Sequence, residues 1–198
     1  MGTGFVLESH SAAETQAYGE ALATLLQPND VLLLCGELGA GKTQFAQGIA
    51  AGLGISQPIT SPTFNILLVY DIEKPVEHSA SQEGRQGQQS LQSPQGPQGR
   101  EGRPSRQAPQ GQQAPLQLYH FDLYRLEEAE QLVDIDYFAM LEDGAISLVE
   151  WGDRFAEVLP LDYLLIELNI SADGHRQIAA SSVGQRSTQL LAGWQASL

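Results

Sequence analysis

The chain has 198 residues, enough for one domain with a full hydrophobic core, and carries a formal charge of −14. Such an acidic body repels phosphate backbones, which argues against unaided binding of nucleic acid. No apolar run approaches the ~18 residues of a membrane span, so no membrane association is expected. The single cysteine, Cys35, excludes an intrachain disulfide and is typical of a reducing compartment, which makes the cytoplasm the expected location.

The first part of the chain alternates between strand and helix patterns. Ser11 can cap a helix, because Glu14 stands three residues later in the capping-box position. Pro62 excludes a helix that would run through its surroundings. The predicted elements are, in order, a strand at Phe5–Ser9, a helix from Ser11 to about Gln27, a buried strand at Val31–Cys35, a helix at Lys42–Leu53 and a strand at Asn65–Ile72.

Residues 79–115 have a composition that does not support a hydrophobic core. Gln, Gly, Pro and Ser dominate this segment, and Leu91 is its only large apolar residue, so it buries too little surface to fold alone. It holds four Arg and two Glu, which leaves six basic and 22 acidic side chains, and a charge of −16, on the rest of the chain. We interpret it as a disordered insert in a hairpin of a single domain that spans residues 1–198.

Regular patterns return after the insert. Alternation along the next predicted strand places His120 and Asp122 on one face. The predicted elements are a strand at Leu116–Tyr124, a helix at Glu127–Leu141, a strand at Ala145–Glu150, a short helix at Asp153–Val158, a strand pair at Tyr163–Ile170 and Arg176–Ser182, and a helix at Ser187–Trp194. Interleaved strands and helices predict a three-layer α/β domain with a mainly parallel central sheet.

The most informative motif is Gly-Glu-Leu-Gly-Ala-Gly-Lys-Thr at residues 36–43, which matches the phosphate-binding template G-x-x-x-x-G-K-[ST]. Its glycines let backbone N–H groups turn inward, and the helix that follows presents its positive end to an anion. Lys42 would supply a charge for the β- and γ-phosphates, and Thr43 a hydroxyl for Mg²⁺. The alternative is a Gly-rich turn without a ligand. The order strand, loop, helix favours the phosphate site and a P-loop NTPase-like domain.

Other polar residues are candidates to complete such a site. Glu150 ends an apolar strand, where a carboxylate can enter the Mg²⁺ shell, although an ordinary acid at a strand end is the alternative. Taken alone, Asp122 indicates a surface residue and His120 a structural histidine. Thr63 could reach the γ-phosphate like a switch residue, or serve only as a turn hydroxyl. Cys35 indicates a small buried hydrophobe. No Cys/His set has the spacing of a transition-metal site.

Four motifs together resemble the TsaE family, formerly called YjeE. They are the loop at 36–43, Ser-Pro-Thr-Phe at 61–64, Tyr-His-Phe-Asp-Leu-Tyr-Arg-Leu at 119–126 and Val-Glu-Trp at 149–151. The resemblance covers nearly all of residues 5–182. It implies a small P-loop ATPase that uses ATP and Mg²⁺ and joins the TsaB and TsaD proteins. That assembly forms N6-threonylcarbamoyladenosine in tRNAs that read codons beginning with A.

The resemblance also implies roles for individual residues. It assigns Thr43 and Glu150 to the metal, and Lys42, Asp122 and Glu150 to catalysis. The implied nucleotide-binding set is Glu37, Leu38, Gly39, Ala40, Gly41, Lys42, Thr43, Gln44, Thr63 and Trp151. Two features depart from the family pattern: Gln44 stands where a second Thr is common, and the insert is not a family feature.

The sequence leaves two other functions open. One is a small-molecule kinase that uses the same loop, which would need a lid with basic residues. The other is an ATP-gated adaptor whose turnover is incidental. There is no Asn-Lys-x-Asp motif for guanine, so the preference for adenine comes from the resemblance. The acidic surface argues against direct capture of tRNA, and the resemblance implies that tRNA is contacted only indirectly, through TsaD and TsaB.

Overall fold

The computed structural model of the chain describes residues 4–62, 65–73 and 115–198. Thr63 and all of the predicted insert except Pro115 lie outside the described residues. The disorder of the insert, and a single domain over residues 1–198, therefore stay predictions.

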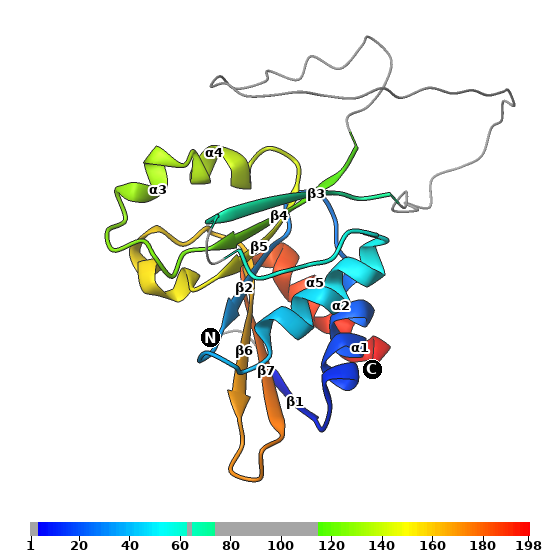
Figure 1. Cartoon of the computed structure of the whole chain (residues 1–198). Coiled ribbons are helices and arrows are strands. Elements are labelled where there is room, and N and C mark those ends of the chain that lie inside the picture. The colour runs from blue at the N-terminus through cyan, green and yellow to red at the C-terminus, as the bar shows by residue number, and fades with distance from the viewer. Residues whose placement is uncertain (1–3, 63–64, 74–114) are drawn as a thin grey trace, which may run out of the picture. The chain divides into compact units, whose positions relative to one another are not determined.

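A seven-stranded sheet with the order β1-β7-β6-β2-β5-β4-β3 forms the middle layer of the described residues (Figure 1). The strands β6, β2, β5 and β4 pair in parallel, whereas β1, β7 and β3 pair antiparallel at the two edges. The predicted parallel sheet is thus confirmed in its middle. The strands are β1 (Phe5–Ser9), β2 (Val31–Cys35), β3 (Leu67–Asp71), β4 (Gln117–Asp122), β5 (Ile146–Glu150), β6 (Tyr163–Ile170) and β7 (Arg176–Val183).

Helices cover both faces of the sheet, which confirms the three-layer prediction (Figure 1). One face is covered by α1 (Ala12–Ala23), α2 (Lys42–Leu53) and α5 (Gln185–Ser197). The other carries α3 (Gln131–Asp134), α4 (Tyr137–Leu141) and the 3₁₀ helix η1 (Gly152–Val158). Among the described helices, none combines the length and the apolar content needed to cross a bilayer.

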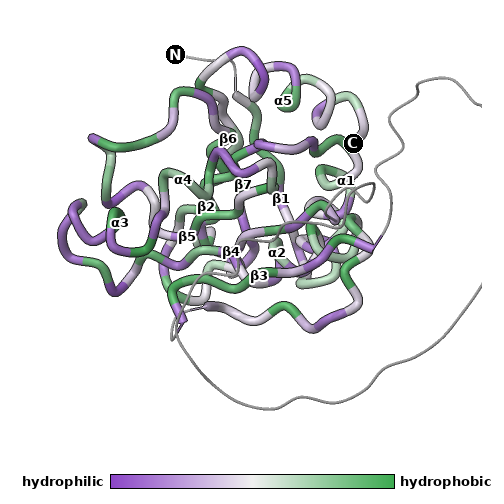
Figure 2. The backbone as a smooth tube through the Cα atoms, turned by 90° about the horizontal axis from the view of Figure 1, so that it is seen from above, coloured by the Kyte–Doolittle hydropathy of each residue, from purple (hydrophilic) through white to green (hydrophobic). Residues whose placement is uncertain are grey.

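The central strands contribute side chains to both of the cores that these layers enclose. In β2, Leu32 and Leu34 pack in the core under α1, α2 and α5, whereas Val31 and Leu33 pack in the opposite core. Burial on both faces explains why β2 is apolar throughout rather than alternating. Figure 2 shows hydrophobic residues concentrated along the middle strands, with hydrophilic residues in the outer loops.

Two predicted helices have different limits in the structure. The helix predicted at Glu127–Leu141 is wrong as one element: it is divided into α3 and α4, with Asp136 between them at a φ of 57°. Asp tolerates this left-handed conformation better than most residues, and one such residue ends the hydrogen-bond ladder. α1 ends at Ala23 rather than near Gln27, because Leu25 N donates to Leu22 O in a tighter turn just before Pro28.

The pair α1 and α2 meets backbone to backbone at glycines. A Cβ atom added at Gly48 would lie 2.0 Å from Gln16 O, and one added at Gly19 would lie 2.4 Å from Phe45 O. No side chain fits between the two helices at these points. The close approach therefore fixes the position of α2, the helix that follows the 36–43 loop.

We expect Gly48→Ala to destabilise the fold by about 1–3 kcal/mol, because the added methyl overpacks the α1–α2 contact. The matched control is Gly193→Ala in α5, where a Cβ would meet Leu25 Cδ1 at an ordinary 3.4 Å. That variant should gain roughly 0.5–1 kcal/mol from helix propensity. Urea denaturation measures both changes. An unchanged midpoint for Gly48→Ala would contradict the packing described here.

We expect the hairpin β3–β4 to close without the insert. Asp71 pairs with Gln117, and Ile72 N donates to Leu116 O over 2.9 Å, so the two ends of the hairpin already lie side by side. Replacing residues 79–115 by a short Gly-Ser linker should keep or raise the melting temperature, since each halving of a loop removes about 0.6 kcal/mol of closure cost. A lower melting temperature would mean that the insert contributes stabilising contacts.

Candidate functional site

Three parallel strands end in register at one edge of the sheet. Leu34 of β2 pairs with Glu150 of β5, and Glu150 pairs with Asp122 of β4. The segments that follow these strands therefore meet at the carboxyl edge, where open α/β sheets hold their ligands.

The segment after β2 is a glycine turn. Gly39 and Gly41 have φ values of 83° and 111°, in the left-handed region where other residues are strained. The turn leads directly into α2, whose N-terminus has no side-chain cap and no acidic residue in its first turn. By contrast, α1 is capped by Ser11, which accepts from Glu14 N. The amide groups at the start of α2 are thus oriented for an anion.

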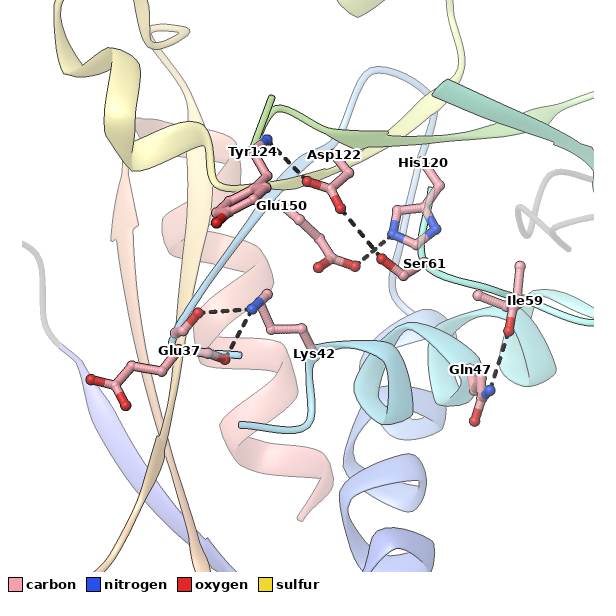
Figure 3. A network of polar contacts seen from close by, with 10 residues as sticks. Glu37, Lys42, Gln47, Ile59, Ser61, His120, Asp122, Tyr124 and Glu150 are labelled. Atoms are coloured by element: carbon pink, nitrogen blue, oxygen red, sulfur yellow. Dashed lines mark hydrogen bonds and ion pairs between the residues drawn. The ribbon is translucent and has the colours of Figure 1, made fainter. Parts of the chain in front are cut away.

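Lys42, the first residue of α2, has a buried ammonium group that is held by the loop itself. The residue is 6% exposed, and its Nζ donates to Gly36 O over 2.8 Å and to Glu37 O over 3.2 Å (Figure 3). The Nζ atom also lies 4.5 Å from the ring centroid of Trp151. These contacts compensate the burial of the charge. Glu37 contributes its carbonyl, while its exposed side chain points away from Lys42 (Figure 3).

The two candidate carboxylates are both 2% exposed, so the reading of Asp122 as a surface residue is wrong. Asp122 accepts from Tyr124 N over 3.0 Å and from Ser61 Oγ over 3.3 Å. Glu150 Oε1 lies 3.0 Å from His120 Nε2 (Figure 3). Asp122 is buried because parallel pairing places it beside Glu150, in the interior of the sheet rather than at its edge.

Trp151 follows Glu150 directly and has a φ of 62°. A left-handed bulky residue is strained and persists only where its surroundings fix it. Here the indole ring contacts Lys42 on one side, and its centroid lies 5.1 Å from that of Tyr124. The left-handed backbone at Trp151 redirects the chain after β5, and the aromatic ring lies beside the ammonium group.

A cavity of about 560 Å³ joins these groups. Nine predicted site residues line it: Leu38, Gly39, Gly41, Lys42, Thr43, Gln44, Asp122, Glu150 and Trp151. Glu37 and Ala40 do not line it and instead border a smaller cavity beside β6. Thr63 lies outside the described residues. Four further residues line the cavity and were not predicted from the sequence: Ala12, Thr15, Ser61 and Arg176.

Of these four, Arg176 carried a signal as one of six basic residues outside the insert, and Ser61 as part of the motif at 61–64. The hydrogen bond from Ser61 to Asp122 joins residues 61 positions apart, which a local motif does not predict. Ala12 and Thr15 belong to α1, and nothing in their local pattern points to a ligand. Their place in the cavity follows from the packing of α1 on α2.

The structure shows the surroundings of two further residues that the sequence made notable, Gln44 and Cys35. Gln44 Oε1 accepts from Gln16 Nε2 over 2.9 Å, so this departure from the family pattern ties the start of α2 to α1. Cys35 is confirmed as a small buried residue. Burial, reinforced by the carboxylate of Asp153, raises the pKa of the Cys35 thiol to about 12, which keeps it protonated and unreactive at neutral pH.

The donor set suits Mg²⁺ bound together with phosphate. Thr43 and Glu150 offer hard oxygen ligands, and Lys42 with the loop amides offers positive charge. Within residues 4–62, 65–73 and 115–198, no group of three or more His, Cys, Asp or Glu side chains could hold a metal ion. Mg²⁺ needs no such group, because it takes one or two protein ligands and completes its shell with phosphate and water.

Comparison with known proteins identifies the family of this chain. The profile of the family described as "Threonylcarbamoyl adenosine biosynthesis protein TsaE" matches residues 9–80 and 107–178. The chain belongs to the TsaE family. The first matched range includes the loop at 36–43, the second includes the strands β4 and β5, and the break between them falls within the predicted insert.

Individual TsaE relatives are similar over most of their length. The protein named tRNA threonylcarbamoyladenosine biosynthesis protein TsaE from Treponema pallidum is 34% identical over 173 residues, which cover 87% of this chain and 97% of the relative. The protein of the same name from Bacillus subtilis is 31% identical over 87% of this chain and 82% of its own. The solved structure described as "Crystal structure of Bacillus subtilus YdiB" superposes with a TM-score of 0.66 and 26% identity, covering 99% of this chain and 97% of that one.

Proposed function

We propose that this chain is the ATP-binding and ATP-hydrolysing component of the machinery that makes N6-threonylcarbamoyladenosine in tRNA, acting with TsaB and TsaD. Membership of the TsaE family supports the pathway. The observation that carries the nucleotide assignment is the buried Lys42 ammonium beside the uncapped start of α2, in a cavity that Asp122 and Glu150 also line.

Phosphate binding follows from groups that are already in place. The loop amides and Lys42 would hold the β- and γ-phosphates, and the bonds from Lys42 to Gly36 O and Glu37 O preset its position. Thr43 and Glu150 would hold Mg²⁺. Bound Mg²⁺ neutralises the charge that develops on the phosphate oxygens during transfer.

Asp122 is suited to orient the attacking water. Its carboxylate lines the cavity and accepts from Ser61 Oγ and Tyr124 N, which restrict its orientation. Trp151 keeps an apolar surface over Lys42, which limits access of bulk water to the ammonium group. The chain's own residues thus supply binding, orientation and charge.

The rest of the molecule favours a supporting role in the pathway. Outside the insert, the chain carries −16, which repels tRNA, so the transfer chemistry is assigned to the partners. ATP binding would assemble or reset the complex, and slow hydrolysis would release it. A small-molecule kinase would need a basic lid, whereas only Lys42 and Arg176 are basic among the residues that line the described cavity.

The decisive experiment compares ATP turnover of the chain alone, with TsaB, with TsaD and with both. Stimulation by the pair supports the proposal. Turnover that is stimulated only by a small acceptor molecule would support the kinase. Formation of modified tRNA with a non-hydrolysable ATP analogue would support an adaptor without essential turnover.

We expect Lys42→Ala, Glu150→Ala and Asp122→Ala each to lower partner-stimulated turnover by about 10²–10³-fold, because each removes a preorganised charge at the phosphates, the metal or the water. The control is Asp134→Ala, an exposed acid of α3 in the opposite layer, which should keep wild-type turnover. Circular dichroism checks the fold of each variant. Wild-type turnover by folded Glu150→Ala would remove Glu150 from the metal site.

We expect no measurable binding of tRNA to the isolated chain at physiological salt. Affinity for nucleic acid depends on neutralising phosphates, and the chain outside the insert has six basic and 22 acidic side chains. The four arginines of the insert are the plausible exception. A gel shift with micromolar affinity that survived deletion of residues 79–115 would contradict indirect contact.

A further inference from the structure

His120 occupies a position in the sheet where an apolar residue would be expected. It is 0% exposed, and its register partners on the neighbouring strands are Leu68 of β3 and Leu148 of β5. Leu118, two residues earlier on the same face, belongs to the core under α2. Apart from its ring nitrogens, His120 therefore lies in an apolar row of side chains.

One ring nitrogen of His120 has a partner and the other has none. Nε2 lies 3.0 Å from Glu150 Oε1 (Figure 3). Because the carboxylate accepts, Nε2 carries the hydrogen in this contact. Nδ1 is buried without a hydrogen-bond partner, and in the described part of the chain only Ser147 Oγ shares that state. Native cores seldom leave such an atom unpaired, so Nδ1 makes a histidine less favourable than a leucine at this position. The feature that a histidine has and a leucine lacks here is the hydrogen bond from Nε2 to Glu150.

His120 lies two residues before the paired acids Asp122 and Glu150 in the register of β4 and β5. Glu150 pairs with Asp122, whereas His120 pairs with Leu148, two residues before Glu150. His120 does not line the 560 Å³ cavity, while Glu150 does. The contact with Glu150 therefore connects the histidine to the cavity.

We propose that His120 is a positioning residue for Glu150: its Nε2–H fixes Oε1 so that the carboxylate presents its other side to a divalent cation bound with nucleotide phosphates. The inference rests on the proposed function. Hydrogen bonds from a second residue commonly orient carboxylates and imidazoles that ligate metals, and their loss weakens metal binding without removing a ligand. His120 contacts Glu150 in the folded chain, although the two residues are 30 positions apart in the sequence.

The test compares His120→Leu, which removes the donor, with His120→Gln, whose amide nitrogen can take the place of Nε2. Calorimetry would measure ADP binding without metal, and then the Mg²⁺ concentration that half-saturates the gain in nucleotide affinity. We expect His120→Leu to need about 10–100-fold more Mg²⁺, with metal-free ADP affinity unchanged, and His120→Gln to stay close to wild type.

Two controls separate positioning from a change in the core. Ser147→Ala removes the other unpartnered buried atom, from the adjacent strand β5, and should leave the Mg²⁺ requirement unchanged. In a Glu150→Ala background, His120→Leu should have no further effect on Mg²⁺, because its route to the metal is gone. An additional effect in that background would overturn the proposal.

A Mg²⁺ requirement of His120→Leu equal to that of wild type would overturn the proposal, as would equal losses in the Leu and Gln variants. If His120→Leu does not fold, His120→Asn replaces it, because its shorter side chain does not reach Glu150; equal behaviour of Asn and Gln would then overturn the proposal. A wild-type chain that bound no nucleotide would instead refute the proposed function itself, and this inference with it.

Discussion

The in-register ends of three parallel strands are the constraint on which the rest of the site depends. Leu34, Glu150 and Asp122 lie opposite one another across β2, β5 and β4. The glycine loop after β2, the residues Glu150 and Trp151, and the carboxylate of Asp122 therefore lie at the same edge of the sheet. A slip of one residue in either pairing would turn its acid to the opposite face. The two cores resist such a slip, because each strand buries side chains on both faces.

Burying this many polar groups is costly, and the structure offsets the cost locally. Lys42 is held by two carbonyls and an aromatic face, Asp122 by a hydroxyl and an amide, and Glu150 by His120. Trp151 adds a strained backbone, a cost of roughly 1–3 kcal/mol that persists only in well-determined surroundings. The glycine contact of α1 with α2 provides part of that rigidity, since it holds the helix that carries Lys42.

The charge near the phosphate-binding loop differs in sign from the net charge of the chain. Lys42 and the start of α2 supply positive charge to the cavity, in a chain whose charge outside the insert is −16. Backbone dipoles act over one helical turn, so they can favour a bound phosphate without making the surface attractive to polyanions. Such a molecule can bind nucleotide phosphates in its cavity although its overall charge disfavours polyanions.

Features that depend on neighbours in sequence could be predicted from the sequence alone: the glycine loop at 36–43, the buried strand Val31–Cys35 and the three-layer order of strands and helices. The break at Asp136 and the burial of Asp122 could not, because a helical pattern does not show which residue takes a left-handed conformation and a strand pattern does not show which strands flank it. The His120–Glu150 contact joins residues 30 positions apart, on two strands that only parallel pairing brings together. Local sequence patterns thus determined the elements and the loop, whereas strand pairing decided which polar side chains share a buried cavity.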